Sequence, residues 1–200
     1  MKKLLLVFSF LVVVAFSWGQ NANEARKILD KTALKLSNKG GVRANFKMSG
    51  RLGNTNGSVA IKGNKFYAST SAAMVWYDGK TQWTYLKRTH EVNVSTPTEA
   101  QQQSMNPYKF LSIYKKGYKL ELKSLSSGWK VHLTANNKSR SIKEMYVEIT
   151  KSYMLKSVKM RQSSGWSTIT ISGFKNASLS DSQFRFNSKD FPEAEIIDLR

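Results

Sequence analysis

The sequence has no cysteine, and it holds only three prolines and two histidines in 200 residues. Without cysteine the chain forms no disulfide, so packing and hydrogen bonds must stabilise the fold. The same absence excludes a lipid anchor on an N-terminal cysteine, so we expect a soluble protein. With no cysteine and so few histidines, no spacing typical of a metal site is present.

Acidic residues are scarce as well, with 13 Asp and Glu against 32 Lys and Arg, which gives a formal net charge of +19. The basic residues are spread along the chain and mostly alternate with apolar ones. That pattern indicates first a solvated outer face. Attraction to anionic lipid headgroups or acidic partners is the alternative interpretation, whereas a nucleic-acid partner conflicts with the export signal described next.

The first residues have the pattern of an export signal. Lys2 and Lys3 precede an apolar run, Leu4 to Phe16, which is short for a membrane span, and Ser17-Trp18-Gly19 ends in small residues. We therefore expect a signal peptide at residues 1–19, cleaved near Gly19, and a single domain at residues 20–200 in the periplasm. Retention of the segment as a membrane anchor is the alternative.

No arrangement of residues indicates catalysis. His90 and His132 each stand inside a strand-like pattern, and no G-x-S-x-G motif, phosphate-binding glycine loop or paired carboxylates are present. We therefore expect no enzyme activity, no cofactor and no metal.

The periodicity predicts a mainly β protein with helices (α+β). Residues 21–38 have apolar residues at helical spacing, and from Val42 the period changes to two. Asp78-Gly79 suits a tight hairpin turn between two aromatic-rich strands. Strands are expected at residues 42–49, 58–62, 65–70, 91–95, 118–122, 129–133, 139–150, 153–161 and 166–172, with a last edge strand near residues 196–199. Short strands joined by tight turns indicate an antiparallel sheet that curls or closes.

Between residues 96 and 114 the alternation stops. Pro97 and Pro107 fall here, residues 98–104 are a short helix candidate, and Asn106-Pro107 resembles a helix start. A helical insert in a β-rich chain has to cover something, so we expect it to cap the sheet or close its mouth as a lid. Ten Phe, eight Tyr, five Trp and seven Met then favour a pocket for an apolar ligand.

The order of these features resembles the periplasmic outer-membrane lipoprotein carrier family, the LolA-like proteins. The resemblance runs from about Asn21 to Arg200. The segments that carry it are the leading helix, Val42 to Phe46, Gly57 to Phe66, Asp78 to Tyr85 with its D-G-K-x-x-W-x-Y pattern, Asn106-Pro107, Phe184 to Phe186, and Asp198 to Arg200.

The resemblance implies an unclosed antiparallel β-barrel, a curved sheet covered by an N-terminal helix and a mid-chain helical lid. It also implies a soluble carrier that binds lipoprotein acyl chains in an apolar cavity and ferries them from the inner to the outer membrane. Its partners would be an inner-membrane ABC-type release complex and an outer-membrane acceptor. We expect a monomer that binds no nucleic acid.

For the cavity and its cover we predict two sets of residues. The cavity wall would comprise Phe46, Met48, Phe66, Trp76, Trp83, Tyr85, Met145, Val147 and Met160. The lid would comprise Tyr108, Phe110, Leu111 and Tyr114. Family members often hold the lid with an arginine after the second strand; here Lys62 is the residue available for that role, without the planar guanidinium.

Two other functions remain open from the sequence. The same scaffold could sense or bind an envelope lipid or lipoprotein without transporting it. Alternatively, the chain could be a structural or adhesive exported protein whose barrel is filled by its own side chains.

Overall fold

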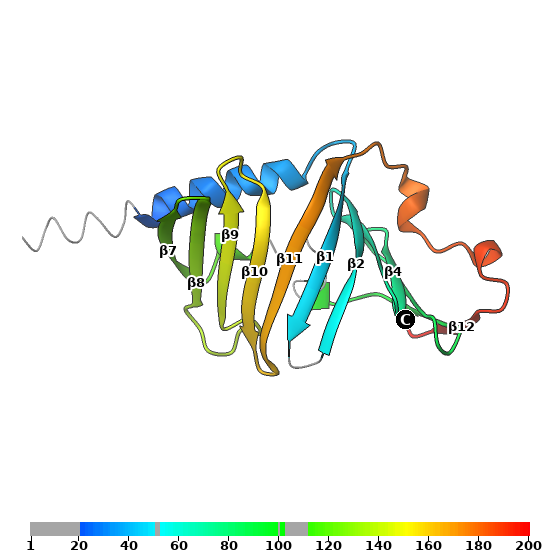
Figure 1. Cartoon of the computed structure of the whole chain (residues 1–200). Coiled ribbons are helices and arrows are strands. Elements are labelled where there is room, and N and C mark those ends of the chain that lie inside the picture. The colour runs from blue at the N-terminus through cyan, green and yellow to red at the C-terminus, as the bar shows by residue number, and fades with distance from the viewer. Residues whose placement is uncertain (1–20, 51–52, 100, 103–111) are drawn as a thin grey trace, which may run out of the picture.

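The structure is a computed structural model that describes residues 21–50, 53–99, 101–102 and 112–200 (Figure 1). Its twelve strands form one sheet in the order β12-β6-β5-β4-β3-β2-β1-β11-β10-β9-β8-β7. The strands are β1 (Val42–Gly50), β2 (Gly53–Lys62), β3 (Lys65–Thr70), β4 (Ala73–Tyr77), β5 (Gln82–Leu86), β6 (Glu91–Ser95), β7 (Tyr118–Leu125), β8 (Gly128–Ala135), β9 (Glu144–Thr150), β10 (Leu155–Gln162), β11 (Gly165–Asn176) and β12 (Glu195–Asp198).

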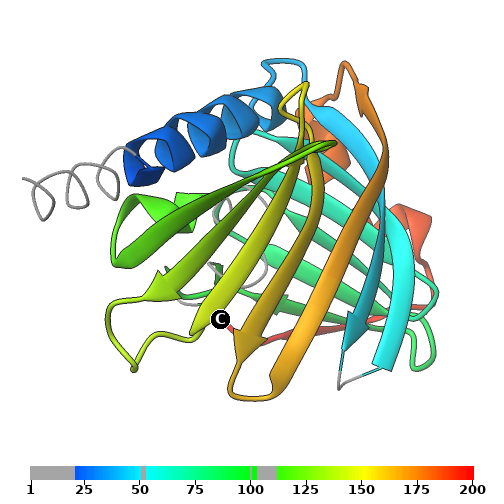
Figure 2. The same cartoon turned by 60° about the vertical axis from the view of Figure 1, so that its left-hand side comes forward.

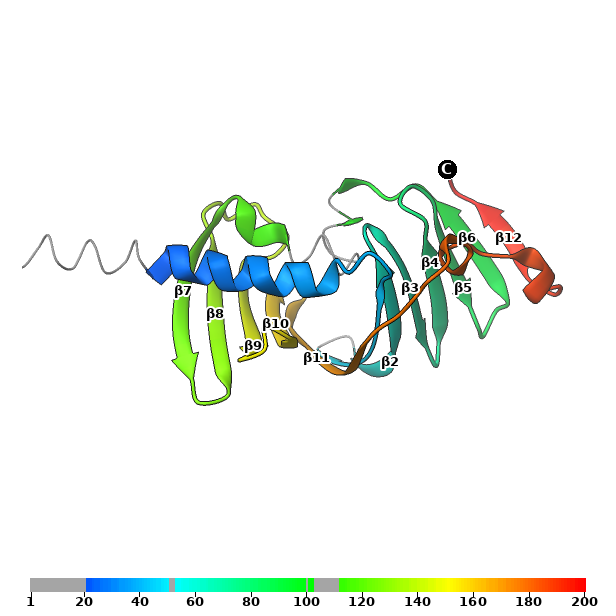
Figure 3. The same cartoon turned by 90° about the horizontal axis from the view of Figure 1, so that it is seen from above.

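The sheet curves around one side, and its two edge strands, β7 and β12, do not pair with each other (Figures 2 and 3). Neighbouring strands are antiparallel except for β12, which runs parallel to β6. The predicted fold class, a mainly β protein with an unclosed curved sheet and an N-terminal helix, is confirmed. The last strand was expected at an edge, but its parallel direction was not.

The N-terminal helix, helical over residues 21–36, lies on the concave side of the sheet (Figure 3). Its apolar stripe enters two clusters. Ala25, Ile28 and Leu29 pack with side chains of β7 to β10, while Leu36 packs with β1 to β4. One amphipathic helix therefore contacts both halves of the sheet, as the helical spacing of its apolar residues requires.

The C-terminal residues 177–194 cross the convex side of β2 to β6 and include two short 3₁₀ turns, η2 (Asp181–Phe184) and η3 (Ser188–Asp190). Phe184 is completely buried against this side. Lys62 and Lys65 both reach Asp181, at 3.1 and 2.7 Å. This half of the sheet is thus covered on its outer face, an arrangement the sequence did not predict.

Two expected strands start at other residues than predicted. The strand expected at residues 58–62 begins earlier, at Gly53, and the strand expected from residue 139 begins later, at Glu144. The structure does not confirm the mid-chain lid, because residues 103–111, with Tyr108, Phe110 and Leu111, lie outside the described part of the chain. The predicted signal peptide, residues 1–19, also lies outside it and stays a prediction.

Candidate functional site

The middle of the concave face carries apolar side chains that are only partly buried. We call these residues of β1, β2, β3, β4 and β11 the central strip: Phe46, Met48, Val59, Ala68, Val75, Ile169 and Ile171. Met48 is 38% exposed, which is unusual for a methionine at the centre of a twelve-stranded sheet. Since apolar area left in contact with water is unfavourable, the strip is the surface of this face best suited to an apolar ligand.

Strand register holds the strip together. Phe46 pairs with Ile171 of β11 on one side and with Gly57 of β2 on the other, and Met48 pairs with Ile169. A Cβ atom at Gly57 would approach the Phe46 ring to 3.0 Å and would clash with the Ser69 carbonyl oxygen. Glycine therefore keeps the space beside Phe46 open and the adjoining strand close.

Two buried clusters flank the strip on the same face. One lies under the N-terminal helix and includes Met145, Val147 and Met160 of β9 and β10. The other includes Phe66 and the end of the helix. Six of the nine predicted wall residues thus share the concave face, Phe46 and Met48 in the strip and the other four in these clusters. Whether they contact an acyl chain stays a prediction.

The remaining three predicted wall residues, Trp76, Trp83 and Tyr85, lie on the convex face. Trp76 and Trp83 pair with each other, and the register of β3 with β4 brings Tyr77, not Trp76, onto the face of Phe66. Trp76 contacts the rings of Phe186 and Phe191, both at 5.6 Å between centroids. Both faces of residues 74–77 are apolar, so alternation alone could not assign the side.

The strip also contains residues that the site prediction left out, among them Val59, Ala68 and Val75. Their strands were predicted, but small and β-branched residues carry no signal that separates a ligand-binding face from an ordinary core. The pairing of Val59 with Ala68, and of Ala68 with Val75, shows that these residues share one face of the sheet.

Of the predicted lid residues, only Tyr114 is described. It is buried in η1 (Ile113–Lys115), and its hydroxyl donates a 2.5 Å hydrogen bond to Asp30 of the N-terminal helix. Arg26 of the same helix donates to the Tyr114 carbonyl oxygen at 3.3 Å. Lys62 instead faces the convex side, where its Nζ donates to the Leu179 carbonyl oxygen at 2.8 Å. Thus the helix, and not Lys62, holds the described end of the mid-chain segment.

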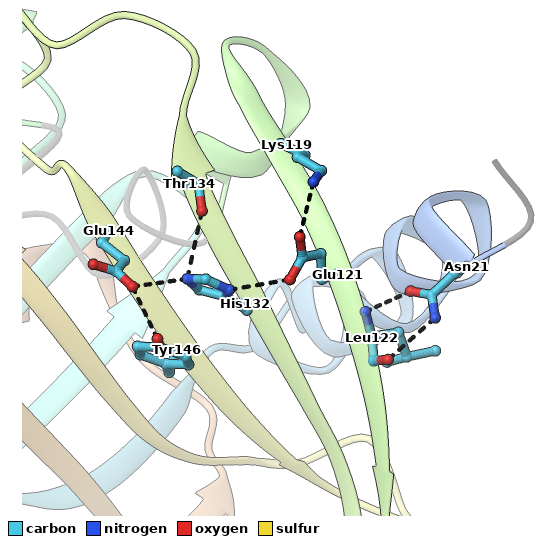
Figure 4. A network of polar contacts seen from close by, with 8 residues as sticks. All are labelled: Asn21, Lys119, Glu121, Leu122, His132, Thr134, Glu144 and Tyr146. Atoms are coloured by element: carbon cyan, nitrogen blue, oxygen red, sulfur yellow. Dashed lines mark hydrogen bonds and ion pairs between the residues drawn. The ribbon is translucent and has the colours of Figure 1, made fainter. Parts of the chain in front are cut away.

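The convex face of β7 to β9 carries a polar network centred on His132 (Figure 4). The His132 ring lies between Glu121 and Glu144, at 3.4 and 2.9 Å, and stacks on Tyr146 at 4.3 Å. The hydrogen bond donated by Tyr146 lowers the pKa of Glu144 and raises that of Tyr146. The Thr134 hydroxyl also lies 3.4 Å from His132 Nε2, so both ring nitrogens have side-chain partners on this strand surface.

His90, the other histidine, contacts the Tyr85 hydroxyl at 3.2 Å beside a turn. Within the residues the structure describes, no group of His, Asp and Glu side chains is suited to hold a metal ion. The described helical segments also include none with the length and apolarity needed to cross a membrane.

Comparison with known proteins identifies a family. The family model described as outer membrane lipoprotein carrier protein LolA matches residues 15–164. An uncharacterized conserved protein from Thermus thermophilus is similar in structure, with a TM-score of 0.60 and 15% identity over 88% of this chain and 99% of that one. At this identity the likeness concerns the fold alone. No curated protein sequence matches.

Two further solved structures are similar at lower scores. One is a putative outer membrane lipoprotein-sorting protein domain from Vibrio parahaemolyticus, with a TM-score of 0.47 and 12% identity over 82% of this chain and 97% of that one. The other is LprF from Mycobacterium bovis, with a TM-score of 0.45 and 12% identity over 80% and 96%.

Proposed function

Because this chain belongs to the outer membrane lipoprotein carrier LolA family, we propose that it is a periplasmic carrier of lipoproteins. In this proposal the concave face binds the acyl chains, and the protein ferries them from the inner to the outer membrane. The observation that carries the proposal is the central strip, in which Phe46, Met48 and Ile171 lie on the concave face yet belong to none of the described buried clusters.

The physical requirement for such a carrier is twofold. Each CH₂ of an acyl chain that leaves water contributes about 0.8 kcal/mol, so the carrier must cover most of the chain in transit. It must also release the chain, so contacts should be adaptable and not fitted to one shape. Met48 and the branched side chains of the strip can repack around different chains, which favours binding without a unique geometry.

The family and the expected export support the proposed route. The donor would be an inner-membrane ABC-type release complex, and the receiver an acceptor at the outer membrane. Neither step requires bond chemistry in the carrier, so the function does not need His90 or His132. The proposed location is the periplasm, after removal of residues 1–19.

A charge placed in the strip tests the proposal. Phe46→Glu should abolish saturable binding of a fluorescent fatty-acid probe, because a carboxylate on the concave face opposes burial of hydrocarbon. Leu34→Glu is the matched control, since Leu34 is 72% exposed on the outer side of the helix and the same chemical change there should leave binding intact. Circular dichroism of both variants shows whether the sheet remains folded.

The bound cargo separates the remaining functions. Triacylated lipoprotein recovered with the protein purified from the periplasm, and lost in Phe46→Glu, supports transport. Free envelope lipid as the sole cargo would instead support a lipid-binding or sensing role. Absence of saturable probe binding by the unmodified protein would contradict both and favour a filled barrel.

A further inference from the structure

Four neighbouring strands near the middle of the sheet contain no acidic residue. β2, β1, β11 and β10 stand side by side in the middle of the sheet, and their sequences contain no Asp or Glu. Apart from Ala60 and Trp166, the side chains that alternate to the convex side are basic or carry hydroxyl and amide groups. We call four of them, with an aromatic neighbour, the basic crest: Arg43, Lys47, Lys159, Lys175 and Trp166.

Two members of the basic crest are like charges that face each other across neighbouring strands. Arg43 of β1 lies directly opposite Lys175 of β11, and both are exposed. Like charges at opposed positions destabilise a sheet. None of the ion pairs among the described residues involves Arg43, Lys47, Lys159 or Lys175. The fold therefore keeps four positive charges here that no acidic side chain of the described residues neutralises.

The neighbouring strands show that this is a local feature. On the convex face of β8 and β9, Lys130 pairs with Glu148 at 2.8 Å and His132 contacts two glutamates. Charges there are balanced within the sheet. The balance ends at β10, where Arg161 still reaches Glu144 at 3.2 Å but Lys159 reaches only the Trp166 ring.

Trp166 gives the basic crest its one large apolar group. It is 37% exposed near the β10–β11 turn, with Lys159 Nζ 4.8 Å and the Arg161 guanidinium carbon 5.8 Å from its ring. An exposed tryptophan flanked by cations is typical of side chains at the boundary between water and lipid headgroups.

We propose that the basic crest docks the protein on a bilayer surface rich in anionic phospholipid headgroups. Dispersed lysines suit such a surface, because each cation near it is attracted without a fixed partner geometry. A protein partner fits less well, since lysine is depleted at protein interfaces and Trp166 is the only large apolar side chain here. Three of the four cations are lysines.

The basic crest and the proposed cargo-binding surface lie on different faces of the sheet. Its residues alternate along β1 and β10 with side chains such as Val42 and Val158, which pack in the clusters that include the N-terminal helix, so a docked protein keeps its concave face free. Docking through the basic crest does not depend on what occupies the central strip. It would stand even if no acyl chain binds there.

The test measures binding of the exported protein to vesicles. Phosphatidylcholine vesicles with and without phosphatidylglycerol are compared by flotation, for the unmodified protein and for Lys47→Gln/Lys159→Gln. Removal of two such charges should weaken binding to the anionic vesicles roughly 30-fold. Lys35→Gln/Lys39→Gln is the matched control, because it changes the net charge equally at two exposed lysines outside the basic crest. Added salt should weaken the binding of unmodified protein.

Trp166→Ala provides a second variant, which should weaken binding even at a salt concentration that removes most of the electrostatic contribution. Selective binding to anionic vesicles that is lost in the crest variant and kept in the control supports the proposal. Equal loss in both double variants would overturn it, since net charge alone would then explain the binding. No preference for anionic vesicles, or binding only to an acidic protein, would also overturn it.

Discussion

The two faces of the sheet are covered by opposite ends of the chain, and they are covered in different ways. On the concave side the N-terminal helix presents one continuous apolar stripe, which contacts both halves of the sheet. On the convex side residues 177–194 have little regular structure and attach through separate rings, Phe184, Phe186 and Phe191. Periodicity in the sequence predicts the first cover, whereas the second has no period to detect.

The two faces also differ in how much apolar surface they leave exposed to solvent. The convex aromatic side chains are occupied by the C-terminal segment, as Tyr85 and Phe191 show with ring centroids 4.7 Å apart. The concave side has partly exposed apolar side chains in its centre, and Phe46, Met48 and Ile171 belong to neither of the buried clusters that include the helix. Ligand binding is therefore expected on the face with the simpler cover.

The largest effect should come from removing the main anchor of the convex cover. Phe184→Ala should lower the free energy of unfolding by about 3–5 kcal/mol, because a fully buried ring leaves a cavity. Urea denaturation measures the change. Phe186→Ala, at a half-buried ring of the same segment, should cost less. Equal, small changes for both would mean that the segment is only loosely attached.

The helix should show a strong contrast between its two sides. Leu29→Ala should cost about 2–5 kcal/mol, since Leu29 is 2% exposed in the larger cluster. Leu34→Ala, the same change at a 72% exposed position, should stay within about 0.5 kcal/mol. Thermal unfolding of both variants checks this. A large cost at Leu34 would show that something outside the described residues packs on the outer side of the helix.

A smaller effect is expected where the convex cover is held by charge. The amines of Lys65 and Lys62 hold the pKa of Asp181 below its ordinary value. Asp181→Asn should therefore destabilise the protein only slightly at neutral pH, because the pair is exposed to solvent, and added salt should remove the difference. Melting temperatures at low and high salt give the measurement. If Asp181→Asn lowered the stability as much as Phe184→Ala does, apolar contacts would not be the main attachment of the C-terminal segment.

The smallest effect concerns pH. The pKa of Glu144 is lowered, first by the hydrogen bond from Tyr146, and that of Glu121 is lowered, first by Lys119. A lowered folded-state pKa adds stability above the ordinary glutamate value of 4.5, which is lost as the pH falls through the folded-state pKa. In Glu144→Gln the midpoint of urea denaturation should therefore fall less steeply as the pH is lowered below 4.5.

Glu193→Gln, at an exposed carboxylate with no ion pair among the described residues, is the control for the pH series. It should leave the decline unchanged. If the urea midpoint of Glu144→Gln fell with pH as steeply as that of the unmodified protein, the Glu144 carboxylate would be excluded as a source of acid sensitivity.

Much of the sheet was predictable because strand alternation and turn residues act locally. The predicted strands at residues 65–70 and 91–95 coincide with β3 and β6. The face on which an apolar strand packs could not be predicted from the sequence. Trp76 and Tyr77 are both buried on opposite faces, so the choice depended on distant residues such as Phe186. Likewise, Lys62 could be assigned to Asp181 only once the C-terminal segment was placed.

The parallel pairing of β12 with β6 has a consequence for how the chain folds. β11 lies near the middle of the sheet and β12 at its edge, so the chain between them passes six strands. Only then does the Leu199 amide donate a hydrogen bond to the Val94 carbonyl oxygen. Contacts so distant in sequence form late, because closing a long loop costs entropy before any contact is gained. Until the C-terminal segment docks, Trp76 and Tyr85 lack the rings of Phe186 and Phe191 that cover them, so the period of greatest vulnerability to aggregation should end only when this segment is in place.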